Sequence, residues 1–247
     1  MSVHTSKKRR ETPPGFRPVK VNGRICYSAR HNPEVLYHHE LLREFLQQKY
    51  GLQIHFPDQM ECLAKHKGNR FFLRVDIKNA FASVRVFPAL SALDLPPGVE
   101  EFHYFFFHQD GGLIEGAPCS PLLFNLYFQT TVENELASWA KERNLTWSRY
   151  VDDILFSGNK FIHKKELGSL TRLLARHGFV LNRRKTRLAD SHREPVEYLG
   201  AVIYRGRFDV TDEFRQKLTL LRNQLPESRR EYDGLNAWKK RVLALNR

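Results

Sequence analysis

Apolar residues recur every three or four positions along six stretches of the chain, and this period predicts amphipathic helices. Some stretches also carry start and stop signals, such as Asn32 before Pro33, Ser120 before Pro121, and a closing Gly51. The predicted helices run from Pro33 to Gly51, from Asp58 towards Lys65, from Ser120 past Trp139, across Leu167–Leu174, across Phe214–Leu225 and across Leu235–Leu245.

Shorter runs of apolar, aromatic and β-branched residues between these helices predict strands. They are a hairpin within Phe16–Arg30 turned at Asn22-Gly23, then Phe71–Ile77, Phe102–His108, Leu145–Ser148, Leu155–Gly158, a strand followed by a basic loop within Phe179–Thr186, and a hairpin at Val196–Tyr204. The strands on either side of Asp152-Asp153 form a hairpin, so two adjacent carboxylates lie at its tip.

The chain of 247 residues is basic, with 40 Lys and Arg against 27 Asp and Glu and a net charge of +13. This excess predicts a polyanionic partner, nucleic acid ahead of an anionic membrane surface. The arm that carries Lys7-Lys8-Arg9-Arg10 is either a solvated tail or a contact to nucleic-acid phosphates.

No apolar run approaches the ~20 residues of a membrane span, and Met1–Arg10 lacks the apolar centre of a secretory signal. Cys26, Cys62 and Cys119 are far apart and odd in number, which indicates neither a disulfide framework nor a zinc site. We therefore expect a cytoplasmic protein that does not bind membranes.

Asp152 and Asp153 are the first candidates for a chemical site. Adjacent carboxylates repel each other and have poor strand propensity, so the pair is either a solvated turn or a cation site. Asp76 lies near the end of the predicted strand Phe71–Ile77, where burial of an unpaired charge is costly. Because Mg²⁺ takes carboxylate oxygens together with substrate phosphates, the three aspartates are candidate metal ligands.

Five short motifs follow one another in a definite order. They are Asp76 with Phe81, the loop Glu115–Pro121, Tyr150-Val151-Asp152-Asp153, Gly178–Asn182 leading to Lys185-Thr186, and Tyr198-Leu199-Gly200. In this order they resemble the palm of a reverse transcriptase of the bacterial retron and group II intron type. The resemblance covers about residues 16–245.

The resemblance implies an α/β (α+β) chain with the right-hand polymerase fold. In that fold an antiparallel sheet backed by helices forms the palm, which lies between the fingers and a short helical thumb. We expect a flexible basic arm at 1–15, fingers at 16–70, a palm at 71–205 with a fingers insertion within about 82–115, and a thumb at 206–247.

The reaction that the resemblance implies is attack of a primer 3′-hydroxyl on the α-phosphate of a dNTP. Two Mg²⁺ ions about 4 Å apart, with Mn²⁺ as an alternative, stabilise the attacking and leaving oxygens. By resemblance, Asp76, Asp152, Asp153 and the carbonyl of Ile77 hold these ions. Lys185 stands where the family has a proton donor or charge clamp for pyrophosphate, and simple phosphate attraction is the alternative interpretation.

Residues around the nucleotide and the primer follow from the same resemblance. Phe81 matches a steric gate, a ring that clashes with a ribose 2′-hydroxyl and favours dNTPs; an ordinary core phenylalanine is the alternative. The expected nucleotide-binding residues are Phe81, Glu115, Gly116, Ala117, Lys20 and Arg24. The expected primer- and template-binding residues are Tyr150, Ser120, Pro121 and the primer grip Tyr198, Leu199 and Gly200.

Three positions depart from the family pattern. The loop begins with Glu115 where the family has Gln, which replaces an amide donor with negative charge beside a triphosphate. Cys62–His66 keeps only the histidine of the retron pattern Asn-Ala-x-x-His, and Val210-Thr211-Asp212 keeps two residues of Val-Thr-Gly. These departures leave the subfamily open.

The sequence therefore predicts an RNA-directed DNA polymerase from a small bacterial retron-like or phage-defence system. Its expected partners are an RNA template, the DNA–RNA hybrid and dNTPs, together with a structured non-coding RNA and an effector protein. Two alternatives stay open, namely untemplated or protein-primed DNA synthesis by the same fold, and a catalytically decayed RNA-binding module. Phe81 disfavours an RNA-dependent RNA polymerase.

Overall fold

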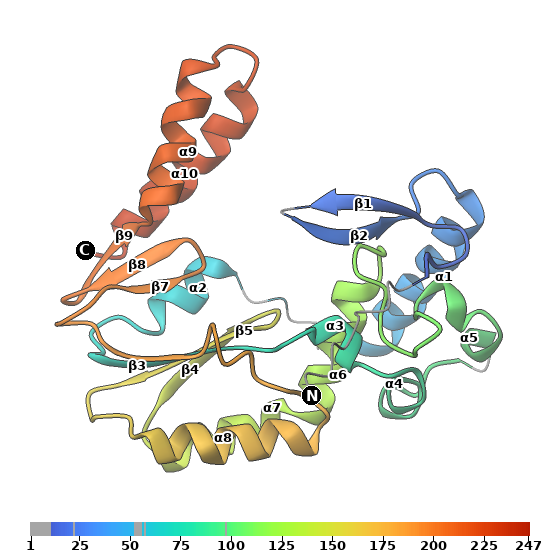
Figure 1. The fold of residues 1–247 in the computed structure, drawn as a ribbon, viewed down its shortest axis with the longest axis horizontal. Coiled ribbons are helices and arrows are strands. Elements are labelled where there is room, and N and C mark those ends of the chain that lie inside the picture. The colour runs from blue at the N-terminus through green and yellow to red at the C-terminus, as the bar shows by residue number, and fades with distance from the viewer. Residues whose placement is uncertain (1–10, 22, 52–55, 57, 97) are drawn as a thin grey trace, which may run out of the picture. The chain divides into compact units, whose positions relative to one another are not determined.

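The computed structural model describes every residue except 1–10, 22, 52–55, 57 and 97. Residues 1–10 of the predicted basic arm and Asn22 of the first turn lie outside the described residues. The chain divides into two compact units, unit 1 (Met1–His55 and Asn79–Thr131) and unit 2 (Phe56–Lys78 and Val132–Arg247) (Figure 1). The division into fingers, palm and thumb stays a prediction.

Unit 1 combines a two-stranded hairpin with one long helix and several shorter ones. Its elements are β1 (Arg17–Val21), β2 (Arg24–Ser28), α1 (Pro33–Tyr50), α3 (Ala80–Ser83), α4 (Val86–Leu93), α5 (Gly98–Glu101), a 3₁₀-helix (His103–Phe105) and α6 (Ser120–Thr131). The N-cap of α1 is Asn32, whose Oδ1 accepts from the backbone N–H groups of Glu34 and Val35 at 3.1 and 3.3 Å. The hairpin and α1 confirm the predictions for this segment, because both depend on local signals.

The aromatic run at 102–108 was predicted as a strand, and this prediction is wrong. The run contains the 3₁₀-helix His103–Phe105, and the ring of Phe102 stacks on His38 of α1 with centroids 4.3 Å apart. Consecutive aromatic residues carry no period, so the sequence does not distinguish a buried strand from a turn packed against a helix.

Unit 2 is built on a four-stranded antiparallel sheet with the order β4-β5-β3-β6. The strands are β3 (Phe71–Asp76), β4 (Thr146–Tyr150), β5 (Asp153–Gly158) and β6 (Arg187–Asp190). One face is covered by α7 (Glu133–Glu142) and α8 (Lys164–Arg176) (Figure 1), and Trp139 of α7 meets Phe156 of β5 edge-on at 5.0 Å between centroids. β3 and the β4–β5 hairpin confirm the predicted strands that carry the three aspartates.

The opposite face of this sheet packs against α2 (Gln59–Ala64) and a three-stranded sheet of order β7-β8-β9. The strands are β7 (Val196–Tyr198), β8 (Ala201–Tyr204) and β9 (Arg207–Val210). Phe72 and Leu155 of the first sheet share a buried apolar cluster with Tyr198, Ile203 and Phe208 of the second. The helices α9 (Asp212–Asn223) and α10 (Arg229–Ala244) confirm the two predicted C-terminal helices, and α10 packs on α9 and β9.

The long helix predicted from Ser120 is interrupted and is not capped as expected. α6 and α7 are separated by Val132, whose φ of −119° leaves the helical range. Ser120 lies at the first position of α6, and its hydroxyl donates to the carbonyl of Ile114 at 2.7 Å instead of accepting from a helix N–H. The Ser-Pro pair therefore predicted the start of the helix correctly, whereas the prediction that the Ser120 hydroxyl caps the helix is wrong.

The strand predicted within 179–186 is not formed, whereas the basic loop predicted after it is confirmed by a turn at 183–185. Within this described segment, pairing is limited to one bridge between Leu181 and Ile77, and the strand β6 begins only at Arg187. The backbone N–H of Asn182 donates to the carbonyl of Asp76 at 2.8 Å, and the N–H of Lys185 then donates to the carbonyl of Asn182 at 3.0 Å. No helix in the described ranges is long and apolar enough to cross a membrane.

Candidate active site

Three aspartates from two distant segments of unit 2 meet at one end of the four-stranded sheet. Asp76 ends β3 and Asp153 begins β5, and the two residues are direct cross-strand partners. Asp152 lies in the turn before Asp153, and its carbonyl accepts the backbone N–H of Ile77 at 3.2 Å. Directly opposed residues of antiparallel strands have Cβ atoms roughly 5 Å apart, so the sheet register brings the side chains of Asp76 and Asp153 together.

The turn that carries Asp152 is fixed from the core side. Val151 has a φ of 54°, in the left-handed region that β-branched residues avoid. Arg149 is buried; its Nη1 donates to the carbonyl of Val151 at 3.1 Å, and its Nε donates to Glu133 of α7 at 2.9 Å. Strained backbone persists where its surroundings over-determine it, and the Arg149–Glu133 pair provides that constraint.

Two of the carboxylates are paired with cations of the same unit. Nζ of Lys185 donates to Oδ2 of Asp76 at 2.8 Å, and Nδ2 of Asn182 donates to Oδ1 at 3.0 Å. On β3, Nη2 of Arg74 donates to Oδ1 of Asp153 at 3.1 Å. Lys185 is predicted at the site from the sequence, whereas Arg74 and the amide of Asn182 are not. The available signal for Arg74 was strand alternation, which puts it on the same face as Asp76.

The chemistry of the three carboxylates suits a hard divalent cation. Burial raises the pKa of Asp152 above its ordinary value, and the charges of Asp153 and Asp76 raise it further. A divalent cation relieves that repulsion, and carboxylate oxygens are the ligands that hard cations prefer. In the described part of the chain, no three His, Cys, Asp or Glu side chains form a ready metal cluster, and Asp76 and Asp153 contact Lys185 and Arg74 instead.

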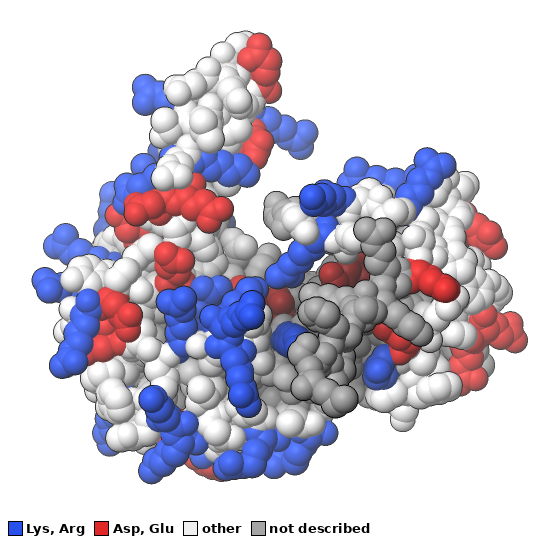
Figure 2. Space-filling model, viewed as in Figure 1, with Lys and Arg blue, Asp and Glu red and all other residues white. Residues whose placement is uncertain are grey.

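A cleft of about 560 Å³ opens between the four-stranded sheet and the segment that leads into β7. Its charged lining consists of four basic and two acidic residues: Arg74, Arg184, Lys185, Arg187, Glu194 and Glu197. Lys and Arg side chains are also spread over the face of unit 2 that is visible in Figure 2. Such a surface attracts the phosphates of a nucleic acid.

Tyr198, a predicted primer-grip residue, is fully buried and belongs to a polar network. Its hydroxyl lies 3.1 Å from Oγ of Ser148 on β4, which in turn lies 2.8 Å from Nε2 of His66. Nδ1 of His66 lies 2.6 Å from Oγ of Ser157 on β5. Burial lowers the pKa of His66 to about 3, which keeps the ring neutral. The network joins β7 to both strands of the hairpin that carries Asp152 and Asp153.

The other predicted primer and template residues of unit 2 lie at two turns. Tyr150 is the last residue of β4 and the cross-strand partner of Asp153. Leu199 and Gly200 connect β7 to β8, with φ values of 50° and 76°. Two successive positive φ values are typical of a type I′ hairpin turn, and glycine suits the second position.

Predicted nucleotide-binding residues in the loop Glu115–Ala117 lie beside β2 in unit 1. The backbone N–H of Tyr27 donates to the carbonyl of Glu115 at 2.7 Å. Gly116 has a φ of 97°, and a Cβ at this position would lie 2.7 Å from the carbonyl oxygen of Tyr27. Ala117 is buried. Close approach of two backbone segments therefore requires glycine at position 116.

The remaining predicted site residues also belong to unit 1. Lys20 on β1 and Arg24 on β2 are exposed, as is Pro121, whereas Ser120 is buried. The half-buried ring of Phe81 packs against Phe124 with centroids 5.4 Å apart. Participation of these residues in one site with the aspartates of unit 2 stays a prediction.

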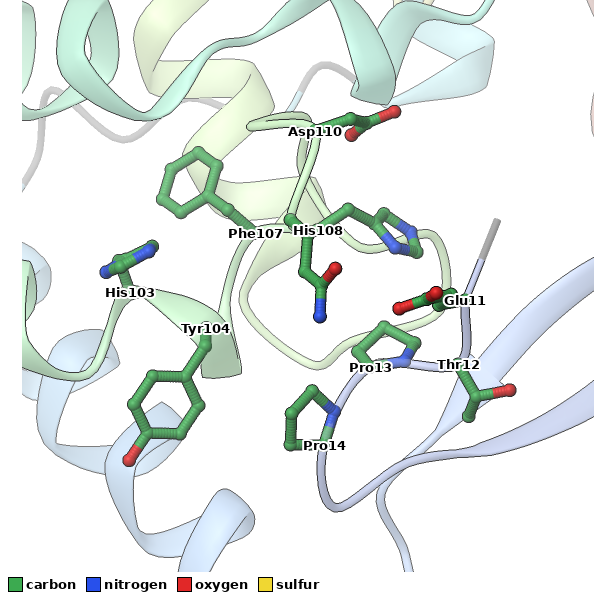
Figure 3. A pocket seen from close by; sticks show the side chains of 10 residues that line it. Glu11, Thr12, Pro13, Pro14, His103, Tyr104, Phe107, His108 and Asp110 are labelled. Atoms are coloured by element: carbon green, nitrogen blue, oxygen red, sulfur yellow. The ribbon is translucent and has the colours of Figure 1, made fainter. Parts of the chain in front are cut away.

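Unit 1 also contains a cavity of about 380 Å³ (Figure 3). Figure 3 shows the rings of Tyr104 and Phe107 and the two prolines around it, and Glu11 and Asp110 also contribute to the lining. Its described lining contains no Lys or Arg. With two carboxylates and no such cation, this cavity does not suit a phosphate.

Comparisons with known proteins identify relatives of the chain. Residues 7–203 match the family model described as reverse transcriptase (RNA-dependent DNA polymerase). The retron Mx65 reverse transcriptase of Myxococcus xanthus is 29% identical over 205 residues, which cover 72% of this chain and 47% of that protein. The retron Ec48 reverse transcriptase of Escherichia coli is 26% identical over 151 residues, which cover 58% and 36%. The chain spans less than half the length of these curated relatives.

A solved structure of the foamy viral protease-reverse transcriptase in complex with double-stranded DNA matches with a TM-score of 0.53 and 19% identity. The match covers 90% of this chain and 35% of that one, and it confirms the predicted α/β (α+β) polymerase fold. The family match spans most of the chain, including the segments that carry Asp76, Asp152, Asp153 and Lys185. The chain therefore belongs to the reverse transcriptase (RNA-dependent DNA polymerase) family.

Proposed function

We propose that this chain is an RNA-directed DNA polymerase that extends a primer with dNTPs along an RNA template. The observation that carries the proposal is the cross-strand pair Asp76–Asp153 with Asp152 in the adjoining turn, in a chain of this family. Asp76, Asp152, Asp153 and the carbonyl of Ile77 would hold two Mg²⁺ ions, or Mn²⁺ in their place. Such ions stabilise the attacking 3′-hydroxyl oxygen and the leaving pyrophosphate.

Lys185 is the residue best placed to assist the leaving group. Its side chain is 45% exposed, pairs with Asp76 at 2.8 Å and lines the basic cleft. From this position Nζ can give a proton or a positive charge to pyrophosphate. Arg184 and Arg187 line the same cleft and supply phosphate contacts.

The relatives suggest the biological setting of this activity. Because they are retron reverse transcriptases, we place the chain among small bacterial retron-type enzymes that copy a structured RNA in the cytoplasm. We also propose that the enzyme acts with an effector protein and has a role in phage defence. The net charge of +13 supports a nucleic-acid partner, and binding to the DNA–RNA hybrid should weaken steeply with added salt.

A primer-extension assay tests the activity directly. The purified chain is given an RNA template, a labelled DNA primer, dNTPs and Mg²⁺, and is compared with Asp152→Asn plus Asp153→Asn. The double variant should lose about a hundredfold or more in extension rate, because metal stabilisation of the transition state is worth several kcal/mol. Glu194→Gln is the matched control, since this exposed carboxylate lines the neighbouring cleft but lies outside the aspartate group.

The sequence and linkage of the products decide between the proposal and its alternatives. DNA complementary to the supplied RNA supports templated synthesis. DNA unrelated to the template indicates untemplated synthesis, and DNA that stays attached to the denatured protein indicates protein priming. Binding of RNA with no incorporation by the wild-type chain, in Mg²⁺ or Mn²⁺, would contradict the enzyme proposal and favour a decayed binding module.

Phe81 provides a test of the nucleotide class. If its ring acts as the steric gate, Phe81→Ala should increase the ratio of rNTP to dNTP incorporation by about tenfold or more. Phe87→Ala is the control, because this ring lies in the same unit and is 78% exposed. An unchanged ratio in a folded Phe81→Ala variant would assign the ring to core packing on Phe124 alone.

A further inference from the structure

The guanidinium of Arg74 joins two strands that belong to different sheets. Nη2 donates to Oδ1 of Asp153 at 3.1 Å, and Nη1 donates to the backbone carbonyl of Glu197 on β7 at 2.9 Å. Glu197 precedes the β7–β8 turn of Leu199 and Gly200, which carries the predicted primer grip. One side chain thus contacts both a candidate metal ligand and the strand that leads into this turn.

The position of Arg74 is set by these two acceptors. The side chains of Arg74 and Asp153 are 28% and 26% exposed, so the ion pair is only partly screened by water. Nε of Arg74 is buried and has no hydrogen-bond partner in the described structure. An unpaired buried donor costs free energy, so this conformation depends on the bonds that the two terminal nitrogens make.

The Arg74 bond competes with a metal ion for Asp153. A carboxylate oxygen that accepts from a guanidinium is less available to a cation, and the positive charge of Arg74 repels that cation as well. Arg74 also lines the cleft of about 560 Å³. A phosphate of a nucleic-acid backbone in this cleft would offer Arg74 another anion, and the arginine fork suits phosphate geometry.

We propose that Arg74 is a positioning residue that couples metal binding at Asp153 to nucleic-acid binding in the cleft. A backbone phosphate draws Arg74 away from Asp153, and the released carboxylate becomes a metal ligand. The inference rests on the proposed function, because it requires both a metal ion and a DNA–RNA hybrid. By linkage, the hybrid and the metal ion must raise each other's affinity by the same factor.

The experiment measures Mn²⁺ affinity of the full chain by electron paramagnetic resonance, without catalysis. Titrations are made with and without a DNA–RNA hybrid whose primer ends in a 3′-dideoxynucleotide. In the wild type, the hybrid should raise Mn²⁺ affinity by about fivefold or more. In Arg74→Met, Mn²⁺ should bind the free protein more tightly than in the wild type, and the enhancement by the hybrid should be largely lost.

Arg187→Met is the matched control. Arg187 is the cross-strand neighbour of Arg74, is exposed and lines the same cleft, so its removal takes away a similar charge without breaking the bond to Asp153. This variant should keep most of the hybrid-dependent enhancement. If Arg74→Met and Arg187→Met change Mn²⁺ affinity to the same extent, general electrostatics explains the result and the proposal is wrong.

Two further experiments test whether Arg74→Met acts by misfolding and whether it acts through Asp153. They are a conservative variant and a double-mutant cycle. Arg74→Lys keeps the charge but cannot bridge both acceptors, so it should show a smaller change in the same direction even if Arg74→Met folds poorly. In an Asp153→Asn background, Arg74→Met should strengthen Mn²⁺ binding much less than in the wild type, because only the charge repulsion is then removed. A full effect of Arg74→Met in that background would overturn the proposal.

The two proposals fail in different ways. A chain that shows the Arg74-dependent Mn²⁺ enhancement but makes no DNA contradicts the proposed polymerase function and leaves the coupling intact. A chain that extends primers on RNA but shows an unchanged enhancement in Arg74→Met contradicts the coupling and leaves the polymerase function intact.

Discussion

Lys185 and Asp76 lie 109 positions apart in the chain, and Nζ of the lysine donates to Oδ2 of the aspartate at 2.8 Å. The pair is asymmetric, because the side chain of Asp76 is 5% exposed and that of Lys185 is 45% exposed. A buried carboxylate needs a compensating partner, whereas an exposed lysine can turn to another anion or to water. Lys185 can therefore leave Asp76 when a cation replaces it there.

Replacement of Lys185 by methionine should slow catalysis more than it weakens binding. Loss of a group that assists the leaving pyrophosphate should lower the single-turnover extension rate by about a hundredfold. Arg184→Met is the control, because Arg184 is exposed and lines the same cleft next to Lys185. Hybrid affinity should fall by similar small factors in both variants. Equal extension rates for the two variants would show that Lys185 acts only by attracting phosphate.

The positions of the aspartates could be predicted from the sequence, because Asp76 and Asp153 lie at the ends of strands and Asp152 lies in the turn of a hairpin that the local pattern predicts. Asp76 and Asp153 then meet through the sheet register, which needs no further information. The contact between Asp153 and Arg74 could not be predicted in this way. Arg74 reaches it across one face of the sheet, and its second bond goes to β7. That arrangement depends on how two sheets pack, which strand patterns do not contain.

The environment of the Tyr198 side chain also could not be predicted from the sequence. The hairpin predicted at Val196–Tyr204 is confirmed by β7 and β8, whereas the burial of the Tyr198 side chain and its network with Ser148 and His66 were not predicted. Polar residues from four separate segments of the chain produce this network, and no sequence period links them. The histidine of the retron-like segment was noticed as a motif residue, whereas its buried position required the structure.

His66 should make the protein sensitive to moderate acid. Its pKa is about 3 in the folded protein against 6.5 for an ordinary histidine, so the unfolded chain binds more protons below pH 6.5. The stability from neutral His66 is complete above pH 6.5 and is lost as the pH falls towards 3. The loss is about 1.4 kcal/mol per pH unit at most.

Urea unfolding between about pH 7 and 5 checks this prediction. His66→Gln should flatten the decline of unfolding free energy with falling pH, whatever its stability at pH 7. His192→Gln, at an exposed position, should keep the wild-type slope. His39 is also buried, with a pKa lowered to about 4, so His39→Gln plus His66→Gln should be flatter still. A wild-type slope in His66→Gln would show that its protonation does not limit acid stability.

Gly116 and Gly234 should respond to alanine in opposite directions. At Gly116 a methyl group meets the backbone of Tyr27 at 2.7 Å and the φ of 97° is unfavourable, so Gly116→Ala should cost about 2 kcal/mol or more. Gly234 lies within α10, and an added methyl group there would find nothing within 4 Å, so Gly234→Ala should gain up to about 1 kcal/mol. Thermal unfolding of both variants measures the difference. Destabilisation by both would mean that α10 does not tolerate the added methyl group.

Replacement of Val151 should release backbone strain near the aspartates. Its φ of 54° costs a β-branched residue about 1–2 kcal/mol, and asparagine tolerates this conformation better. Val151→Asn should therefore raise the unfolding free energy by about 1 kcal/mol in urea, with an unchanged m-value. Val180→Asn is the control, since Val180 is 58% exposed and has no positive φ, and its effect should stay within about 0.5 kcal/mol. A loss of stability in Val151→Asn that exceeds the control would mean that packing of the valine side chain outweighs the backbone strain. Because Arg149 and Glu133 hold the same turn, a gain in stability would also support the view that this partly buried pair maintains the position of Asp152 against the local preference of the chain.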